Sequence, residues 1–458
     1  MRKYPKYKKS NLLGIEDAPI QWTEKRMKHI AAKKRFAIVD GPFGTQLKAE
    51  EYTESGVALI RISDLNWGGT IETEELKYIS EEKSQELLRS SITIDDIIIA
   101  KTGATIGKSV LNDKIGFGII ASSCLKISPN KKEVEPWYLN YLISSKEAQE
   151  LIILMSGGST RDTINTQPLA NIKFYWPSLP EQHAIVRFLD YKTGQIDSFI
   201  TNRQKQIELL KEQLRKKIYT ALTKGLSNKD FKSTALAWFP EIPKNWELYK
   251  FNAAIKLLHG FQFRDNHFRE HGVKVAKITQ LKADGSLDLS EASFVEEKFL
   301  IQLKDKIIKS GDILMALTGG TIGKIICVED LQEEVLQNYR VGKFIPKDKR
   351  QLKKEFMFWV LSSEFTFAQI LFLQRETGQP NIGISDFSKM FFPMPDTLEE
   401  QIEITTFIVN QKSETDTLIS KYQKQIDLMQ EYRTSLISQA VTGKIDVREW
   451  QPKKKQTA

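Results

Sequence analysis

Asp96–Lys108 reads DIIIAKTGATIGK, and Asp312–Lys324, 216 positions later, reads DILMALTGGTIGK. Nine of the thirteen aligned positions are identical. At the same spacing, GVALIRISDL from Gly56 matches GVKVAKITQL from Gly272, and the QKQI that begins at Gln204 recurs 219 positions later. A period above 200 residues is far too long for a solenoid. The sequence therefore predicts a large module that has been duplicated once.

Each copy mixes strand and helix signals. Val57–Ile62 alternates as a half-buried strand does, and Ile97–Ala100 is a β-branched run typical of a buried strand. Trp137–Ser145 and Phe356–Ser363 have apolar residues at helical spacing and are expected to back the sheet. We therefore predict a mixed α/β (α+β) fold with two similar globular domains and pseudo-twofold symmetry.

The repeat also predicts the domain boundaries. Each globular domain is followed by a long polar helix, and glycine and prolines at Gly225, Pro240 and Pro243 indicate a surface linker between the copies. The predicted segments are a first recognition domain at 1–178, a long helix at 179–225, a linker at 226–243, a second recognition domain at 244–397, a second long helix at 398–445 and a basic tail at 446–458.

Apolar residues in the two helices alternate in steps of three and four, which is typical of a coiled-coil seam. Polar residues at Arg203, Lys217 and Arg433 interrupt the seams, as register-setting positions do. Mutual burial predicts an antiparallel coiled coil, with packing of each helix on its own domain as the alternative. Gly194 is a possible break in the first helix. The predicted seam residues are Ile200, Ile207, Leu210, Leu214, Ala221, Ile419, Tyr422, Ile426, Met429, Leu436 and Ala440.

Composition narrows the class of protein. The chain carries 67 Lys and Arg against 58 Asp and Glu, a net charge of +9, which favours a polyanionic partner such as nucleic acid. Its two cysteines are too few for a disulfide framework, so an intracellular, cytoplasmic setting is expected. No apolar run is long enough for a membrane span.

The glycine-rich segments resemble a Walker A loop but have three residues between the glycines instead of four, so nucleotide hydrolysis is not favoured. A tight turn with amides, hydroxyls and an ammonium group can instead hold a DNA phosphate, and a purely structural turn is equally compatible. The candidate phosphate contacts are Arg61, Lys101, Thr102, Thr105, Lys108, Lys277, Thr318, Thr321 and Lys324.

Other chemistry is not indicated. His267–His271 fits an HxxEH zinc pattern, but Gly272 would end the helix and the first copy has no matching histidines, so no metal site is expected. No methyltransferase catalytic run, glycine fingerprint for a methyl donor or helicase-type nucleotide site is recognisable. We therefore expect no catalytic residues.

This duplicated layout resembles the specificity subunit of type I restriction–modification systems. The resemblance rests on the TGATIGK and TGGTIGK loops, the PEQ and EEQ helix starts, the ALTKGL and AVTGKI helix ends and IPKNWE at Ile242–Glu247. It covers nearly the whole chain, although Ala18–Trp22 departs from the usual form of the leading segment.

The resemblance implies a non-catalytic, double-stranded-DNA-binding subunit for defence against foreign DNA. Each variable domain of the family reads one half of an interrupted target. The helices hold two adenine methyltransferase (modification) subunits, which motor-nuclease (restriction) subunits then join. S-adenosylmethionine, ATP and Mg are expected on those partners and no cofactor on this chain. A nucleotide-hydrolysing enzyme and a self-associating coiled-coil scaffold are the alternatives.

Overall fold

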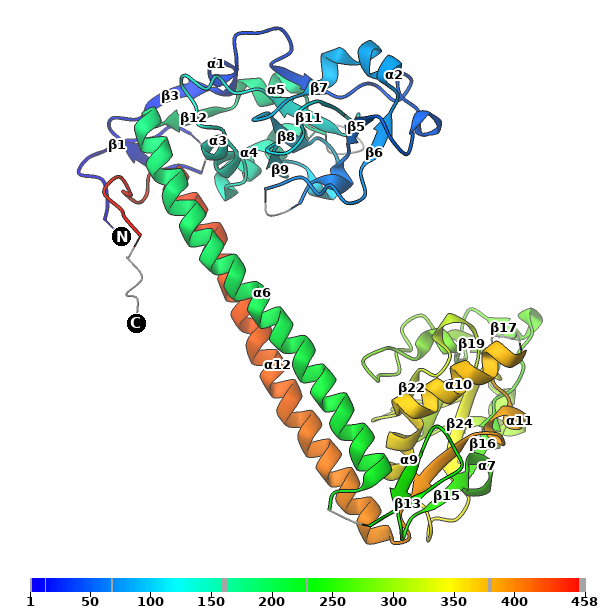
Figure 1. The fold of residues 1–458 in the computed structure, drawn as a ribbon. Helices are drawn as coiled ribbons and strands as arrows, with labels where there is room; N and C mark the ends of the chain where they lie inside the picture. The colour runs from blue at the N-terminus through cyan, green and yellow to red at the C-terminus, as the bar shows by residue number, and fades with distance from the viewer. Residues whose placement is uncertain are drawn as a thin grey trace. The chain divides into compact units, whose positions relative to one another are not determined.

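The computed structural model describes residues 2–12, 14–66, 69–157, 163–227, 230–377 and 381–452. It divides into two compact units. Unit 1 comprises Met1–Gln204 together with Gln423–Ala458, and unit 2 is the continuous stretch Lys205–Tyr422. Each unit contains one globular domain and part of each long helix (Figure 1).

The globular domain of unit 1 is built on two four-stranded sheets. Their strand orders are β6-β5-β10-β7 and β4-β11-β8-β9, and only the β5–β10 pair is parallel. The strands are β4 (Ile38–Asp40), β5 (Val57–Ile60), β6 (Lys77–Ile79), β7 (Ser91–Ile92), β8 (Ile97–Ala100), β9 (Ser109–Leu111), β10 (Gly118–Ile120) and β11 (Cys124–Ile127). The helices are α1 (Met27–Ile30), α2 (Glu81–Glu86), α3 (Pro136–Ile143), α4 (Lys146–Ser156) and α5 (Thr166–Asn171).

Strand β8 lies between two hydrophobic layers, which explains its unbroken apolar sequence. Ile97 and Ile99 belong to the cluster formed with α3 and α4, whereas Ile98 and Ala100 face the other sheet. All four side chains are buried. Because successive residues of a strand point to opposite faces, both faces need apolar side chains here. The domain is thus a helix layer on two stacked sheets (Figure 1).

Unit 2 repeats this architecture with strand orders β17-β19-β18-β23-β20 and β16-β24-β21-β22. Its strands are β16 (Ile255–His259), β17 (Phe268–Arg269), β18 (Val273–Ala276), β19 (Ser293–Val295), β20 (Ile307–Ile308), β21 (Ile313–Ala316), β22 (Ile325–Cys327), β23 (Val335–Gln337) and β24 (Val341–Pro346). Its helices are α7 (Phe251–Ala254), α8 (Lys298–Gln302), α9 (Lys354–Leu361), α10 (Glu364–Thr377) and α11 (Ile384–Phe387). This confirms the predicted mixed α/β fold with two repeated domains.

Two small sheets attach each domain to its helix. In unit 1 they are a hairpin of β1 (Tyr7–Lys9) and β2 (Asp17–Pro19), and a pair of β3 (Thr23–Arg26) and β12 (Lys173–Trp176). In unit 2 they are a hairpin of β13 (Phe231–Ser233) and β14 (Glu241–Pro243), and a pair of β15 (Glu247–Lys250) and β25 (Phe391–Met394). The segment 226–243, predicted as a linker, therefore contains a hairpin.

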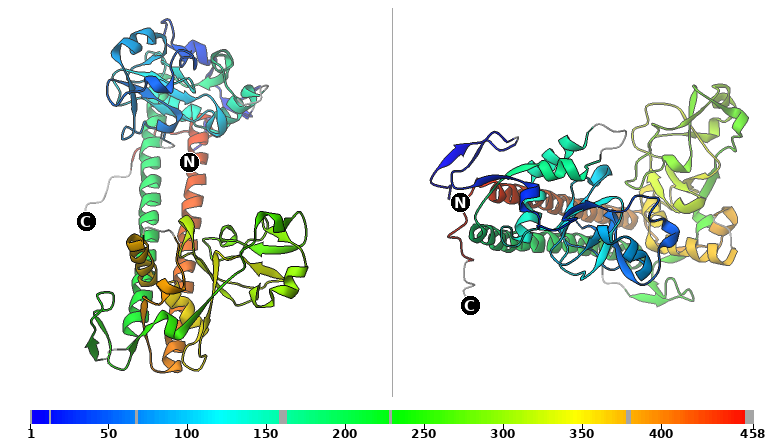
Figure 2. Two further views of the ribbon diagram at one scale, coloured as in Figure 1. Left: turned by 90° about the vertical axis from the view of Figure 1, so that its right-hand side faces the viewer. Right: turned by 90° about the horizontal axis from the view of Figure 1, so that it is seen from above.

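The long helices are α6 (Leu179–Lys224, 46 residues) and α12 (Leu398–Val441, 44 residues). Gly194 does not interrupt α6. In unit 1 the start of α6 packs on the end of α12, where Arg433 Nε donates to Asp197 Oδ1 at 2.9 Å. In unit 2 the end of α6 packs on the start of α12, where Lys217 donates to Gln411. The helices are therefore antiparallel and lie side by side in each unit (Figures 1 and 2).

None of the predicted hydrophobic seam residues is exposed. Lys217, which the helical spacing places in the seam of α6, is exposed, and the neighbouring Ile218 is half-buried instead. Five seam residues are buried, namely Ile207, Ala221, Ile426, Leu436 and Ala440. Six are half-buried, namely Ile200, Leu210, Leu214, Ile419, Tyr422 and Met429.

The start of the predicted basic tail packs on unit 1. Asp446 forms an isolated β-bridge with Arg2, and the Trp450 ring lies 5.2 Å from the Phe188 ring. Residues 453–458 lie outside the described residues. Within the described ranges no single helix has the length and apolar composition to cross a membrane. The bent pair α9 and α10 passes that test together, and Phe356 and Ile370 of this pair are buried in the core of unit 2.

Candidate nucleic-acid interface

The glycine-rich segment of unit 1 is the turn between the antiparallel strands β8 and β9. A 3₁₀ turn at Gly103–Thr105 follows Thr102, and Gly103 and Gly107 have φ of 75° and 80°. L side chains rarely adopt such values, so glycine suits both positions. A Walker A loop opens a helix, whereas this turn is followed directly by a strand. The geometry therefore rejects a nucleotide-phosphate loop, as the spacing predicted.

The backbone of this turn is held by its own hydrogen bonds. Gly107 N donates to Ala100 O at 2.9 Å, and Lys108 N donates to Thr105 O at 3.0 Å. The matching amides of Gly323 and Lys324 make the same bonds at 2.9 and 3.0 Å. These four amides are thus already occupied. The expectation that the turn offers exposed amides fails for these four groups.

The last glycine of each turn also allows a helix to approach closely. A Cβ at Gly107 would lie 2.6 Å from Gln149 Oε1 on α4, and one at Gly323 would lie 2.8 Å from Phe367 Cδ2 on α10. Gln149 Nε2 donates to Gly107 O at 2.6 Å, which fixes the contact. The turns therefore have a clear structural role, one of the two interpretations that the sequence left open.

Lys101 is poorly placed for a phosphate. Its ammonium group pairs with Asp40 Oδ2 at 3.1 Å, and its side chain is only 12% exposed. Arg89 pairs with the other oxygen of Asp40 at 2.7 Å. The corresponding residue of unit 2 is Leu317, which is buried. Lys101 therefore serves a local ion pair, in which Lys101 and Arg89 together compensate the mostly buried charge of Asp40.

Two further candidates are engaged within their own domains. Arg61 NH2 donates to Asp64 Oδ1 at 2.8 Å, and the Asp64 side chain is 5% exposed. Lys277 Nζ donates to Ser293 Oγ at 2.7 Å and lies 4.1 Å from the centre of the Phe268 ring. A polar cavity of about 600 Å³ adjoins Arg61 and Asp64. These cations are fixed in position, but each has its nearest partner inside the protein.

The remaining candidates lie on the turns themselves. Gly103, Ala104, Gly319 and Gly320 are exposed at the tips, and the candidate side chains surround them at intermediate exposure. They are Thr102, Thr105 and Lys108 in unit 1, and Thr318, Thr321 and Lys324 in unit 2. The hydroxyl oxygen of Thr321 is itself buried, which places it poorly for a phosphate contact. Burial lowers the pKa of Lys108 below its ordinary value, and the nearby carboxylate of Glu72 opposes that shift.

The glutamines at the two helix starts bind backbone groups of their own domain, a role that the sequence does not predict. Gln182 Oε1 accepts from Glu135 N at 2.9 Å, and Gln182 Nε2 donates to Glu133 O and Pro177 O, both at 3.0 Å. Gln401 makes the matching bonds in unit 2. Their occurrence in PEQ and EEQ at corresponding positions was the available signal.

The described residues are expected to hold no metal site. Among the described residues, no group of three or more His, Cys, Asp or Glu could hold a metal ion. His267 ends a 3₁₀ turn at Asp265–His267 and is followed by strand β17, so HxxEH does not form the helix that a zinc protease needs.

Comparisons with known proteins agree with this fold. The family model described as "Type I restriction modification DNA specificity domain" matches residues 42–209 and 243–428. The chain is 28% identical over 384 residues to the type I restriction enzyme MjaVIII specificity subunit of Methanocaldococcus jannaschii, covering 82% of this chain and 86% of that protein. It is 29% identical over 183 residues to the EcoBI specificity subunit of Escherichia coli, covering 39% and 36%.

Two solved structures share the fold. One, from work on complex assembly and conformational transition of the type I R-M system, has a TM-score of 0.68 at 15% identity, covering 93% of this chain and 99% of that chain. The HsdS subunit from Thermoanaerobacter tengcongensis has a TM-score of 0.53 at 14% identity, covering 95% and 100%. Since the family model matches both repeats, the chain belongs to the type I restriction modification DNA specificity family.

Proposed function

We propose that this DNA-target-recognition subunit reads a bipartite, interrupted double-stranded site, one half through each unit, and directs methyltransferase and restriction subunits to it. The supporting observation is that the same domain with the same turn occurs twice, each copy followed by a long helix. The chain itself is a non-catalytic component of the system. A nucleotide-hydrolysing enzyme and a self-associating scaffold are not supported.

The side chains at the turns are proposed as sequence-neutral phosphate contacts. Lys108 and Lys324 follow the last glycine of each turn, at corresponding positions of the two domains. Ammonium groups that contact phosphates position a protein on DNA without reading bases. Base readout is therefore assigned to other surfaces of each domain.

Replacing Lys108 or Lys324 with alanine tests the phosphate contact. Each change should weaken binding to all sequences and lower the slope of log affinity against log salt by about 0.9. Lys211→Ala, an equal charge loss on α6, is the control and should leave the slope unchanged. Fluorescence anisotropy with a labelled duplex, from 50 to 200 mM salt, gives the slope. If the slope is unaffected by both turn variants, the turns have only their structural role.

Exchange of one domain tests the division of the target. The structure favours exchanging Thr23–Trp176, because β3 and β12 pair in the register Thr23↔Trp176 and close the domain. Residues 2–22 should remain, since Trp22 Nε1 donates to Glu181 Oε1 on α6 at 3.0 Å. With the same segment of another family member, one half-site should change and the other should persist in a map of methylated sites. Simultaneous change of both halves would disprove the two-headed model.

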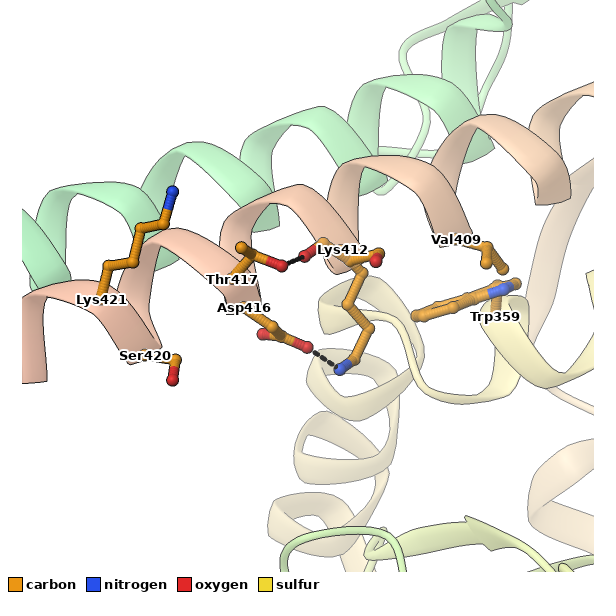
Figure 3. A pocket seen from close by; sticks show the side chains of 8 residues that line it. Trp359, Val409, Lys412, Asp416, Thr417, Ser420 and Lys421 are labelled. Carbon is orange, nitrogen blue, oxygen red and sulfur yellow. Dashed lines mark hydrogen bonds and ion pairs between the residues drawn. The ribbon is translucent and has the colours of Figure 1, made fainter. Parts of the chain in front are cut away.

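The long helices are proposed to space the two heads and to hold two adenine methyltransferase subunits. At 1.5 Å per residue, the 46 residues of α6 correspond to about 69 Å, which exceeds one turn of B-DNA. In unit 2 a groove of about 630 Å³ runs along α12 (Figure 3). The Trp359 ring on α9 lies beside Val409, whose side chain is 49% exposed. This partly apolar surface supports a protein partner on the helices.

Cofactors are assigned to the partners. S-adenosylmethionine is proposed on the methyltransferase, and ATP and Mg on the motor-nuclease subunit. Equilibrium dialysis of the pure chain against each ligand tests this assignment, with no uptake expected. Binding of any of them by the isolated chain would overturn it.

A further inference from the structure

The hairpins that precede the two domains are built alike. β1 and β2 correspond to β13 and β14 at a spacing of 224 residues. The tryptophan after each hairpin donates to a glutamate at the helix start, and the Trp246 Nε1–Glu400 Oε1 bond of 3.1 Å matches the bond made by Trp22. Differences between the two sites therefore come from side chains rather than from a different scaffold.

In unit 2 the space beneath the hairpin is filled by aromatic rings. Phe365, the second residue of α10, is 3% exposed. Its ring centre lies 5.1 Å from that of Phe239 and 6.3 Å from that of Tyr219 on α6. Trp238, at the end of the hairpin loop, packs half-buried against the same core. Phe365 and Phe239 form the buried part of this hydrophobic contact, and Tyr219, which is 37% exposed, lies at its edge.

In unit 1 the corresponding positions carry small or polar residues. Gly14 stands for Trp238, Glu147 for Phe365 and Ser438 for Tyr219, at spacings of 224, 218 and 219. A cavity of about 1490 Å³ lies there between the hairpin, the start of α4 and the end of α12. Small-molecule pockets usually have about 300–1000 Å³, so this groove suits a segment of polypeptide. The same backbone arrangement therefore encloses a groove in unit 1, where unit 2 has aromatic side chains.

Glu147 gives the groove a fixed polar wall. Its side chain is 8% exposed, Lys444 Nζ donates to it at 3.0 Å, and Ser438 donates to its other oxygen. Gly14 has a φ of 78°, and a Cβ there would already contact Glu147 Cγ at 3.5 Å. The hairpin of β1 and β2 therefore lies close to Glu147 at Gly14, and no side chain at Gly14 enters the groove beside α12.

The groove has the opposite charge to the chain as a whole. Its lining has five carboxylates and three ammonium groups, in a chain with a net charge of +9. Such a surface repels DNA and attracts a cationic partner. The carboxylates are Glu16, Asp17, Glu147, Asp427 and Glu431, and the ammonium groups are those of Lys3, Lys146 and Lys444.

We propose that this groove, present in unit 1 and filled in unit 2, docks a lysine- or arginine-bearing segment of a protein partner. Charge complementarity and peptide-sized volume support that occupant. The proposal goes beyond DNA reading, because the groove is unsuited to a phosphate backbone. It also implies that a partner bound here is bound by one half of the molecule and not by the other.

Paired charge removals test the proposal. Asp427→Asn with Glu431→Gln removes two exposed carboxylates from the groove wall. Glu208→Gln with Glu212→Gln removes two from the corresponding positions of α6, 219 residues earlier, and is the matched control. The probe is a fluorescently labelled acetyl-Gly-Lys-Lys-Lys-Gly-amide, and the same peptide with glutamine for lysine is its control. Fluorescence anisotropy at 50 mM salt measures binding to the full chain.

The groove variant should weaken binding of the lysine peptide at least fivefold, and the α6 variant should change it less than twofold. Circular dichroism should show both variants folded, since only exposed side chains change. Equal effects of the two variants, or no binding of the lysine peptide, would overturn the proposal. So would a chain ending at Pro452 that binds the peptide when the full chain does not, because Lys453–Lys455 would then be the occupant.

Discussion

Replacing Gln182 with leucine should destabilise unit 1 strongly, although leucine is of similar size. Gln182 is 1% exposed and makes three hydrogen bonds to the backbone. Leucine would leave Glu135 N and two carbonyl oxygens without that partner. A buried group that loses its partner costs about 1–3 kcal/mol, and partial access of water at Glu135 and Glu133 favours the low end. We therefore expect a loss of about 3 kcal/mol.

That loss is measurable as a melting shift. In a domain of 150–250 residues, 1 kcal/mol corresponds to about 2–4 °C, so the transition of unit 1 should fall by about 6–12 °C. Gln401→Leu should act on unit 2 and cost about 2 kcal/mol, since Gln401 makes two such bonds, to Lys353 N and Gln351 O. Calorimetry gives the shifts. Hydrogen exchange at Glu135 and Lys353 shows which unit is affected.

Gln204→Leu, an exposed substitution on the same helix, is the control and should shift the transition by less than 2 °C. A Gln182→Leu shift as small as this would refute the reasoning. So would accelerated exchange in unit 2 instead of unit 1.

Three further outcomes are expected. Burial raises the pKa of Cys124 to about 12, so native protein should take up one alkyl group, at the exposed Cys327, and urea-unfolded protein two, by mass spectrometry. Burial opposes ionisation of Glu147, but hydrogen bonds and Lys444 outweigh it and lower its pKa. The contribution of ionised Glu147 to folding stability is thus present above the ordinary carboxyl pKa and is lost as the pH falls through the lowered pKa. Urea titrations should therefore show that Glu147→Gln is less stable than the parent at pH 7 and equally stable in acid. Four residues inserted after Gln206 lengthen α6 by about 6 Å and rotate it by about 40° beyond a full turn. The unread gap between the two methylated half-sites should then widen by one or two base pairs. An active variant with the original gap would show that the helix does not set the gap.

The sequence predicted those features that depend on short patterns of neighbouring residues. The offset of 216 between DIIIAKTG and DILMALTG located both central strands, because a strand buried on both faces must be continuously apolar. The seam positions followed from helical spacing alone. Ile207 and Ile426 are buried as that spacing requires. These inferences depend on neighbours within a few residues.

Contacts across long stretches of sequence were not predictable. Lys101 resembled a phosphate ligand, but its partner Asp40 is 61 residues away. The glycine and prolines of 226–243 predict a linker, whereas residues 231–243 form a hairpin that matches the one before Trp22 at a different spacing, 224. Only the folded chain brings Gly14 beside Glu147 and shows the groove.

The discontinuity of unit 1 has a consequence for synthesis on the ribosome. Unit 2 is one continuous stretch, whereas unit 1 needs residues 423–450, which are translated after all of unit 2. At about 5–20 residues per second, the 246 residues from Lys205 to Trp450 take about 12–50 s to add. During that time Trp22 and Phe188 lack Leu436 and Val447 from their core. Unit 1 is therefore begun before unit 2 but completed after it, and its nascent form is the one exposed to aggregation and to chaperones.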